Sequence, residues 1–244
     1  DLVIASGRRA AMVARYIKRK NPDKCSLVHI MYPGPEAVND FDIIAVPNHD
    51  NLMRGAKNII KVIGVPHNVD RDQLSRASLI WNDEFSDFKT PIVGLILGGA
   101  TKRRGFTQQM AMKLACQTAN LVNSLGGSLV ITTSPRTGPL LTNLLNCLSE
   151  KNIKPAFIYD WQSDDVHTDN PYLGILDAAD HLIVTGESTS MCSEACATDN
   201  IVHIFAPEGF LGQKHQLLID ELVSSGYAYL LTDGLVETSP KSAT

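Results

Sequence analysis

The sequence predicts an α/β protein with two Rossmann-like units, each a doubly wound parallel sheet, that face each other across a cleft. Three observations lead to this prediction. Short apolar runs alternate along the chain with amphipathic stretches of helical period. Turns rich in Gly, Pro, Ser and Asn follow these runs, as they do at the carboxyl ends of strands in open sheets. The alternation is interrupted once, by a polar stretch at residues 82–89 that we expect to link two domains.

Composition excludes several classes of protein. A chain of 244 residues can bury a sizeable core, and a net charge of −4 gives no support to a nucleic-acid surface. The five cysteines show neither CxxC spacing nor a pairing pattern, so we predict no metal site, a reducing compartment and a cytoplasmic location. The sequence shows no signal peptide and no apolar run that could span a bilayer, so peripheral contact is the one kind of membrane association that we consider.

The first predicted domain comprises residues 1–85. It begins directly on a buried-type strand, and we therefore expect a βα unit to be missing ahead of Asp1. A helix is predicted at 10–19 from its apolar side, and a second helix of weaker periodicity at 72–81. The predicted strands are 1–6, 26–31, 41–46 and 58–63.

The second predicted domain comprises residues 86–231, and a polar tail follows at 232–244. Its first strand is a continuous apolar run of the kind found inside parallel sheets. The predicted extended segments are 91–97, 128–132, 155–159, 181–185, 201–205 and 227–231. The predicted helices are 108–124, capped by Thr107, then 139–151, 171–178, one that begins near 191, and 213–225.

The segment 181–197 carries the clearest functional pattern. A strand runs into the polar turn 186–190, and the turn opens a helix whose first backbone N–H groups can bind an anion. Ser188 and Ser190 can each cap this helix or contact a phosphate. Glu194 can complete a capping box or accept from a ligand hydroxyl. The alternative is a well-capped helix without a ligand.

Four turns should meet at one edge of the second sheet, because parallel strands share their carboxyl side. They are the segments 98–105, 133–138, 186–190 and 207–216. Backbone amides, hydroxyls and cations suit a diphosphate there, and a carboxylate suits a ribose. The candidate binding residues are Gly98, Gly99, Lys102, Ser134, Arg136, Thr137, Glu187, Ser188, Ser190 and Glu194. Arg136 is equally well explained by a surface salt bridge.

The sequence does not identify the catalytic residues. His49, Asp50 and His67 follow strands of the first domain and are the candidates for a general base, although such histidines are more often satisfied loop residues. No nucleophile elbow, HExxH motif or Ser-His-Asp order is present.

Several strings resemble a known family. They are GRRAAMVARYIKR (7–19), FDIIAVPNHD (41–50), ILGGATK (96–102), ITTSPRTG (131–138) and above all NPYLGILDAADHLIVTGESTSMCSEACATDNIVHIF (170–205). The chain resembles, over nearly its whole length, the mitochondrial-fission family called elongated mitochondria and its bacterial homologues, often labelled nucleoside-diphosphate-sugar epimerase-like. This family is in turn similar to GT-B glycosyltransferases, especially the type that makes lipid II.

The resemblance to that glycosyltransferase type implies roles for individual residues. A glycine-rich loop that holds the diphosphate matches Gly98, Gly99 and Ala100, where Ala100 replaces a hydroxyl. A helix start with phosphate contacts and a ribose-binding acid matches Ser188, Ser190 and Glu194, and a turn that touches the sugar matches Gln213 and Gln216. The usual glycine loop of the first domain, near which a base often sits, has no match.

Three functions follow as hypotheses. The first is a metal-independent glycosyltransferase that uses a nucleotide-diphosphate sugar as donor substrate, with an unknown acceptor and no further cofactor. The second is a non-catalytic adaptor or recruitment protein, which the fission role of the plant family member implies. The third is a nucleoside-diphosphate-sugar epimerase, for which no GxxGxxG string is visible.

Overall fold

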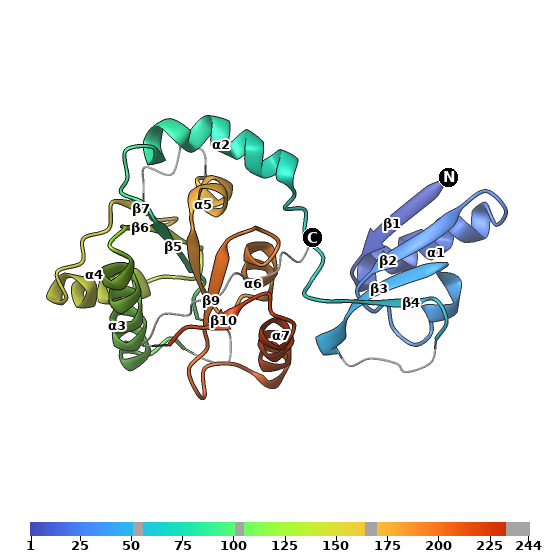
Figure 1. Ribbon diagram of the computed structural model, residues 1–244. Helices are drawn as coiled ribbons and strands as arrows, with labels where there is room; N and C mark the ends of the chain where they lie inside the picture. Colours follow the sequence, from blue (N-terminus) through green and yellow to red (C-terminus); the bar gives the residue numbers. More distant parts are fainter. Residues whose placement is uncertain (51–55, 101–104, 164–169, 233–244) are drawn as a thin grey trace. The chain divides into compact units, whose positions relative to one another are not determined.

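The computed structural model describes residues 1–50, 56–100, 105–163 and 170–232 (Figure 1). It contains two compact units, Asp1–Pro66 and His67–Thr244, and each is described by itself. Unit 1 has a four-stranded sheet and unit 2 a six-stranded sheet. All strand pairs are parallel, which confirms the predicted class of two parallel-sheet α/β domains.

Unit 1 places its strands side by side in chain order, β1-β2-β3-β4. The strands are β1 Leu2–Ser6, β2 Ser26–Ile30, β3 Ile43–Pro47 and β4 Ile59–Val62. One α-helix, α1 (Arg8–Lys20), follows β1, and the short 3-10 helices are η1 (Val38–Asp40) and η2 (Asn48–Asp50). The sequence predicted each strand of this unit to within two residues.

The two faces of the unit 1 sheet differ. On one face, Leu27 and Ile44 are fully buried in a cluster with Ala11 and Ala14 of α1. On the other face, the strand register aligns the aliphatic side chains Leu2, Ile4, Ile43 and Ile60. These four side chains are 40 to 61% exposed. The helix of unit 1 therefore shields one face of the sheet and leaves an aliphatic face on the other.

The unit 2 sheet has the strand order β10-β9-β8-β5-β6-β7. The strands are β5 Ile92–Leu97, β6 Ser128–Thr133, β7 Phe157–Tyr159, β8 His181–Thr185, β9 Ile201–Phe205 and β10 Tyr229–Leu230. The chain moves from β5 to one edge, then returns to β8 and moves to the other edge. This is the Rossmann order, and its switch point, where ligands usually bind, lies between β5 and β8.

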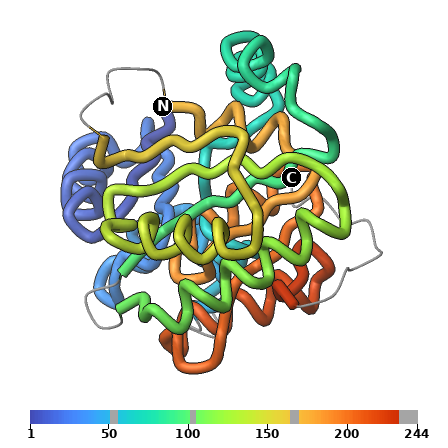
Figure 2. The backbone as a smooth tube through the Cα atoms, turned by 90° about the vertical axis from the view of Figure 1, so that its left-hand side faces the viewer, coloured from blue at the N-terminus to red at the C-terminus, as the bar shows by residue number. Residues whose placement is uncertain are grey.

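Helices of unit 2 lie on both sides of its sheet, with α3 and α4 on one side and α6 and α7 on the other (Figure 1). Seen from the side of the sheet that they cover, α3 and α4 lie next to each other (Figure 2). The helices are α2 Arg71–Phe85, α3 Gln108–Leu125, α4 Leu140–Glu150, α5 Tyr172–Ala178, α6 Thr189–Ala195 and α7 Gln213–Ser224. Within the described ranges, no helix combines the length and apolar character needed to cross a membrane.

The core of unit 2 is built around its two central strands. Every residue of β5 and of β8 is buried. The two strands are also joined at their starts, where the Ile92 N–H donates to the Asp180 carboxylate (2.7 Å) and the Asp180 N–H donates to the Ile92 carbonyl (2.9 Å). The continuous apolar run therefore becomes the buried centre of the sheet, as predicted.

A pair of glycines carries the chain from α3 into β6. Gly126 ends α3 with φ 69°, in the left-handed region that suits glycine. Gly127 lies directly against Pro91, and a Cβ atom at this position would be 1.7 Å from the Pro91 carbonyl oxygen. The first glycine is thus needed for its backbone conformation, and the second for the close approach of two backbone segments.

The helix α2 corrects two predictions. It extends to Phe85, beyond the predicted 72–81, because Trp81 and Phe85 pack against each other (5.9 Å between ring centroids) and both contact Phe157. It packs on α5 and so belongs to unit 2. The division between the units therefore lies between Pro66 and His67, earlier than the predicted division after residue 85.

Asp70 starts α2, since its Oδ1 accepts from the Gln73 N–H at 2.8 Å. Replacing Asp70 with alanine leaves this N–H without a partner, and we expect the free energy of unfolding of unit 2 to fall by about 1 kcal/mol. Urea unfolding followed by circular dichroism measures the change. Asp70→Asn is the control, because asparagine is as good a cap as aspartate. A loss as large in the Asn variant would show that the cap is not the cause.

Two histidines form a buried pair on adjacent strands. Nδ1 of His181 (β8) and Nε2 of His203 (β9) are 3.1 Å apart, and the rings stack. Burial, and then the neighbouring His181, lower the pKa of His203 to about 4. Burial also lowers the pKa of His181, against the opposing charge of Asp180. The pair is therefore neutral at pH 7, with one ring nitrogen donating to the other.

Candidate functional site

The switch point of unit 2 gathers three of the four predicted turns. The turns that follow β5, β6 and β8 are joined by hydrogen bonds between backbone and side chains. These turns contain Gly98 and Gly99, Ser134 to Thr137, and Glu187 with Ser188. The expectation that parallel strand ends meet at one edge is confirmed for these three turns.

The turn after β5 is held by the turn after β8. The Gly98 N–H donates to Thr185 Oγ1 (2.8 Å), and the Gly99 N–H donates to Glu187 Oε1 (2.6 Å). A Cβ atom on Gly98 would lie 1.8 Å from Glu187 Oε1. Glycine is thus needed here so that a carboxylate can approach the backbone. The two amides predicted for a diphosphate are engaged by protein oxygens in this structure.

The turn after β6 is held by its own hydroxyls. Ser134 and Thr137 are buried, and their hydroxyls donate to the Gly98 carbonyl (2.7 and 2.5 Å). A Cβ atom on Gly99 would lie 2.0 Å from the Arg136 carbonyl oxygen, so these two turns pack backbone against backbone. Ser134 and Thr137 therefore shape the edge from inside, and the Arg136 side chain between them is exposed.

Glu187 is the buried acid of the switch point. Its side chain is 3% exposed, and Oε2 has no hydrogen-bond partner among the residues that the structure describes. Burial raises the pKa of Glu187, while hydrogen bonds from Gly99 and Thr185 and the positive charge of Arg136 oppose the rise. Arg136 therefore acts electrostatically on this acid.

Glu194 lies on α6 and is oriented by a residue that the sequence did not single out. The hydroxyl of Tyr172, at the start of α5, donates to Glu194 Oε2 at 2.6 Å. Burial, and then the Glu194 carboxylate, raise the pKa of Tyr172. The other carboxylate oxygen, Oε1, makes no hydrogen bond to any part of the chain that the structure describes. Tyr172 lies inside the string that resembles the family, but no spacing rule links it to Glu194.

Ser188 and Ser190 differ in their surroundings. Ser188 is the N-cap residue of α6 and is buried, but its side chain makes no capping hydrogen bond. Ser190 is exposed. The capping box with Glu194 does not form, because α6 begins at Thr189 and Glu194 lies six residues after the N-cap, beyond the third helical position that a capping box needs. Neither serine hydroxyl is used to cap this helix.

The fourth predicted segment, 207–216, ends in the first turn of α7. Gln213 and Gln216 are exposed, and Gln216 Nε2 donates to Asp220 Oδ1 (2.8 Å). Burial lowers the pKa of His215, and the positive charges of Lys214 and Arg136 lower it further. The start of α7 is therefore within electrostatic reach of Arg136. Among the described residues, no hydrogen bond joins Gln213 or Gln216 to the three turns.

The remaining predicted residues lie elsewhere. Ala100 is exposed after β5, and Lys102 lies outside the described residues. His49 is buried in η2 of unit 1, with Nε2 3.9 Å from Asp50 Oδ1. His67 is exposed and belongs to unit 2, although it was predicted for the first domain. In the described parts of the chain, no group of three His, Cys, Asp or Glu side chains is placed to hold a metal ion.

Solved structures of low sequence identity share this fold. UDP-GlcNAc 2-epimerase from Methanocaldococcus jannaschii aligns with a TM-score of 0.57 and 13% identity, over 100% of this chain and 72% of that chain. The Neisseria meningitidis UDP-GlcNAc 2-epimerase bound to UDP-GlcNAc aligns with a TM-score of 0.54 and 16% identity, over 96% and 64%. MurG from Acinetobacter baumannii aligns with a TM-score of 0.50 and 12% identity, over 97% and 61%. The two units thus resemble the GT-B fold of glycosyltransferases and epimerases.

Sequence comparison identifies relatives. Uncharacterized protein RP120 of Rickettsia prowazekii (strain Madrid E) is 27% identical over 264 residues, which cover 96% of this chain and 73% of that protein. Mitochondrial fission protein ELM1 of Arabidopsis thaliana is 28% identical over 226 residues, which cover 83% of this chain and 51% of that protein. The chain thus spans about half of the plant protein's length. The family model described as Mitochondrial fission ELM1 matches residues 1–243, and the chain belongs to this family.

Proposed function

We propose that the protein binds a nucleoside-diphosphate sugar at the switch point of unit 2 and transfers the sugar without a metal ion. The Glu194 carboxylate carries this proposal. Tyr172 holds one of its oxygens, and the other makes no hydrogen bond to a described residue. A carboxylate fixed in this way at a Rossmann switch point can accept hydrogen bonds from the two hydroxyls of a ribose.

The other groups of the edge have roles in the same proposal. The exposed Arg136 would neutralise the charge that develops on the leaving diphosphate. Ser188 and Ser190 would contact phosphate oxygens, since neither caps α6 with its side chain. The similar fold of an epimerase bound to UDP-GlcNAc supports a nucleotide sugar as the ligand class. His49, Asp50 and His67 stay the candidates for the base.

One observation favours the adaptor as a second candidate function. Thr185 and Glu187 already occupy the Gly98 and Gly99 amides, and the Glu187 carboxylate would repel a diphosphate unless it took up a proton. The family description, Mitochondrial fission ELM1, also fits a recruitment role. An adaptor has no need of a ribose contact, so a single binding experiment separates the two functions.

Glu194→Gln is expected to weaken the binding of a nucleotide sugar by about 10- to 100-fold, because charge-assisted hydrogen bonds to the ribose are lost. Isothermal titration of the full-length protein with UDP-GlcNAc, a GDP-sugar and an ADP-sugar measures the change. Tyr172→Phe should weaken binding less, since it only frees Glu194 to rotate. Glu150→Gln, an exposed acid at the end of α4, is the matched control.

The titrations decide between the proposals. Binding of one donor that Glu194→Gln weakens and Glu150→Gln does not would support the nucleotide-sugar site. No binding of any of the three donors to the full-length protein would overturn it and favour the adaptor. Binding that is equally strong in the Glu194→Gln variant would place the ligand elsewhere and contradict the role of Glu194.

A further inference from the structure

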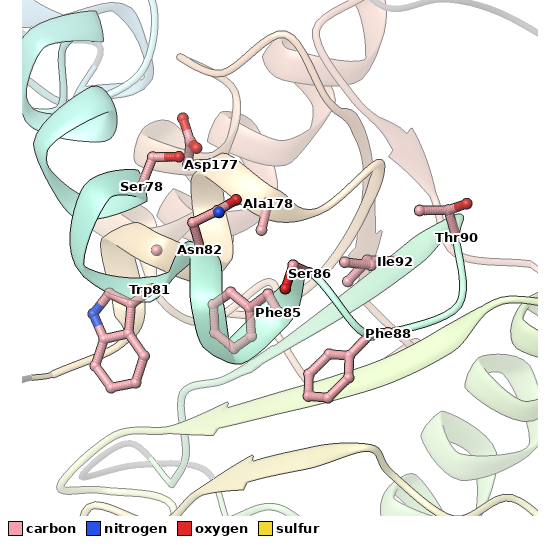
Figure 3. Close-up of a pocket in the computed structure, with 11 residues that line it drawn as sticks. Ser78, Trp81, Asn82, Phe85, Ser86, Phe88, Thr90, Ile92, Asp177 and Ala178 are labelled. Carbon is pink, nitrogen blue, oxygen red and sulfur yellow. The ribbon is translucent and has the colours of Figure 1, made fainter.

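A second site lies at the opposite end of the unit 2 sheet from the switch point. A cavity of about 240 Å³ opens between α2, α5 and the start of β5 (Figure 3). Its lining includes Trp81, Phe85 and Phe88, with Asn82 and Asp177 among its polar residues. Ile92 opens β5 and Ala178 ends α5 before β8, so the cavity lies at the amino ends of the strands whose carboxyl ends form the switch point.

The aromatic wall of the cavity is preformed. Trp81 lies against Gly174 of α5, where a Cβ atom would be 2.6 Å from the indole ring. Phe85 is buried, and its ring meets those of Trp81, Phe88 and Phe157 at centroid distances of 5.9, 5.8 and 5.4 Å. Rings packed in this way cannot turn to fill the space, so the cavity is a fixed feature of the α2–α5 pairing.

The rim of the cavity is acidic. Asp177 is exposed and forms no ion pair or hydrogen bond with the described residues. The segment 82–89 carries three exposed acids, Asp83, Glu84 and Asp87, and one exposed basic residue, Lys89. Asp177 lines the cavity, and the other three acids are neighbours of its lining residues in the sequence. The surface around the cavity therefore carries a net negative charge, which would attract cationic groups and repel anionic lipid headgroups.

An exposed leucine continues the apolar surface along α2. Leu79 is 85% exposed, more than any other large hydrophobic side chain in the described part of the chain. It precedes the lining residue Asn82 by three residues, so it lies one turn from Asn82, at the edge of the helix face that lines the cavity. The cavity and Leu79 thus provide two apolar contacts about one helical turn apart, edged by acids.

The size of the cavity decides what it can hold. Sites for drug-sized ligands are usually about 300–1,000 Å³. A cavity of about 240 Å³ is smaller and suits a single inserted side chain. Apolar anchors spaced by one turn, with basic residues beside them, are how an amphipathic helix binds a groove. A Lys or Arg beside the anchor would meet Asp177.

We propose that this α2–α5 groove docks a basic amphipathic helix of a partner protein. The partner inserts one apolar side chain between Trp81 and Ala178, covers Leu79 with a second, and pairs its Lys or Arg side chains with Asp177 and the acids of 82–88. This interaction surface is independent of the nucleotide-sugar proposal, because it uses none of the residues of the switch point.

The test uses a synthetic helical peptide of Leu, Lys and Ala, about 18 residues long, with Leu at every third or fourth position. The protein is the full-length chain carrying Trp161→Phe, which leaves Trp81 as the one tryptophan of residues 1–244. Titration should change the Trp81 fluorescence in a saturable way. A peptide with Glu in place of Lys should bind at least tenfold more weakly.

Two variants with the same change of charge complete the design. Asp177→Lys should weaken binding of the basic peptide at least tenfold, whereas Glu150→Lys, on an exposed site of α4, should change it less than twofold. Both positions are exposed, so circular dichroism should show an unchanged fold. No saturable change, equal binding of both peptides, or equal effects of Asp177→Lys and Glu150→Lys would each overturn the proposal.

Discussion

Gly127→Ala is expected to lower the free energy of unfolding of unit 2 by about 4 kcal/mol or more, the range reached only by severe core lesions. The new Cβ atom would lie 1.7 Å from the carbonyl oxygen of Pro91, and neither of these backbone segments can move without displacing the start of β5 or of β6. The Ser128 N–H, which donates to the same carbonyl at 3.2 Å, would be displaced as well. Urea unfolding followed by circular dichroism measures the loss.

Gly126→Ala is the matched control for this prediction. Gly126 has φ 69°, and a new Cβ there would meet only the flexible Lys89 Nζ, at 3.9 Å, so alanine has room but an unfavourable backbone conformation. We expect a loss of about 1 kcal/mol. Equal losses at the two positions would mean that conformation, and not the contact with Pro91, explains both glycines.

Acidification from pH 7 to pH 4 is expected to destabilise unit 2 by about 3 kcal/mol through His203 alone. The pKa of His203 falls from 6.5 to about 4 on folding, because the ring is buried and lies beside His181. Above pH 6.5 the ring is neutral in both states and the stability is fully present. Below pH 6.5 the unfolded chain takes up a proton that the folded chain refuses, so stability is lost down to about pH 4.

His203→Gln should reduce this pH dependence, since glutamine can still hydrogen-bond to His181 but does not titrate. His67→Gln is the control, because His67 is exposed. The measurement is the urea midpoint at steps between pH 7 and pH 4, compared between variants so that the titration of carboxylates cancels. A pH profile of His203→Gln that is parallel to that of the parent protein would refute the role of the buried pair.

Most of the fold could be predicted because its signals are local. The strands β5 and β8 are continuous apolar runs, and their predicted limits agree with the structure to within one residue. The end of α2 could not be predicted in this way. Residues 82–84 are polar and exposed, and only Phe85 at the end of the helix returns to the aromatic cluster. The helix α2 belongs to unit 2 because it packs on α5, which is distant from α2 in the sequence.

The sequence could predict where the candidate site lies, but not which contacts form within it. Parallel topology alone brings the turns after β5, β6 and β8 to one edge. It does not reveal that Glu187 reaches Gly99, that Ser134 and Thr137 turn to the Gly98 carbonyl, or that Tyr172 orients Glu194. These contacts depend on side-chain rotamers and on residues far apart in sequence.

The aliphatic face of the unit 1 sheet affects how the protein behaves when it is concentrated. Parallel sheets are nearly always covered on both faces, and Leu2, Ile4, Ile43 and Ile60 leave one face of this sheet in contact with water. Any apolar layer that covered it would lower the free energy of the system, whichever molecule provided that layer. Aggregation during refolding or crystallisation should therefore start at the smaller unit, and polar substitutions on this face are the first remedy to try.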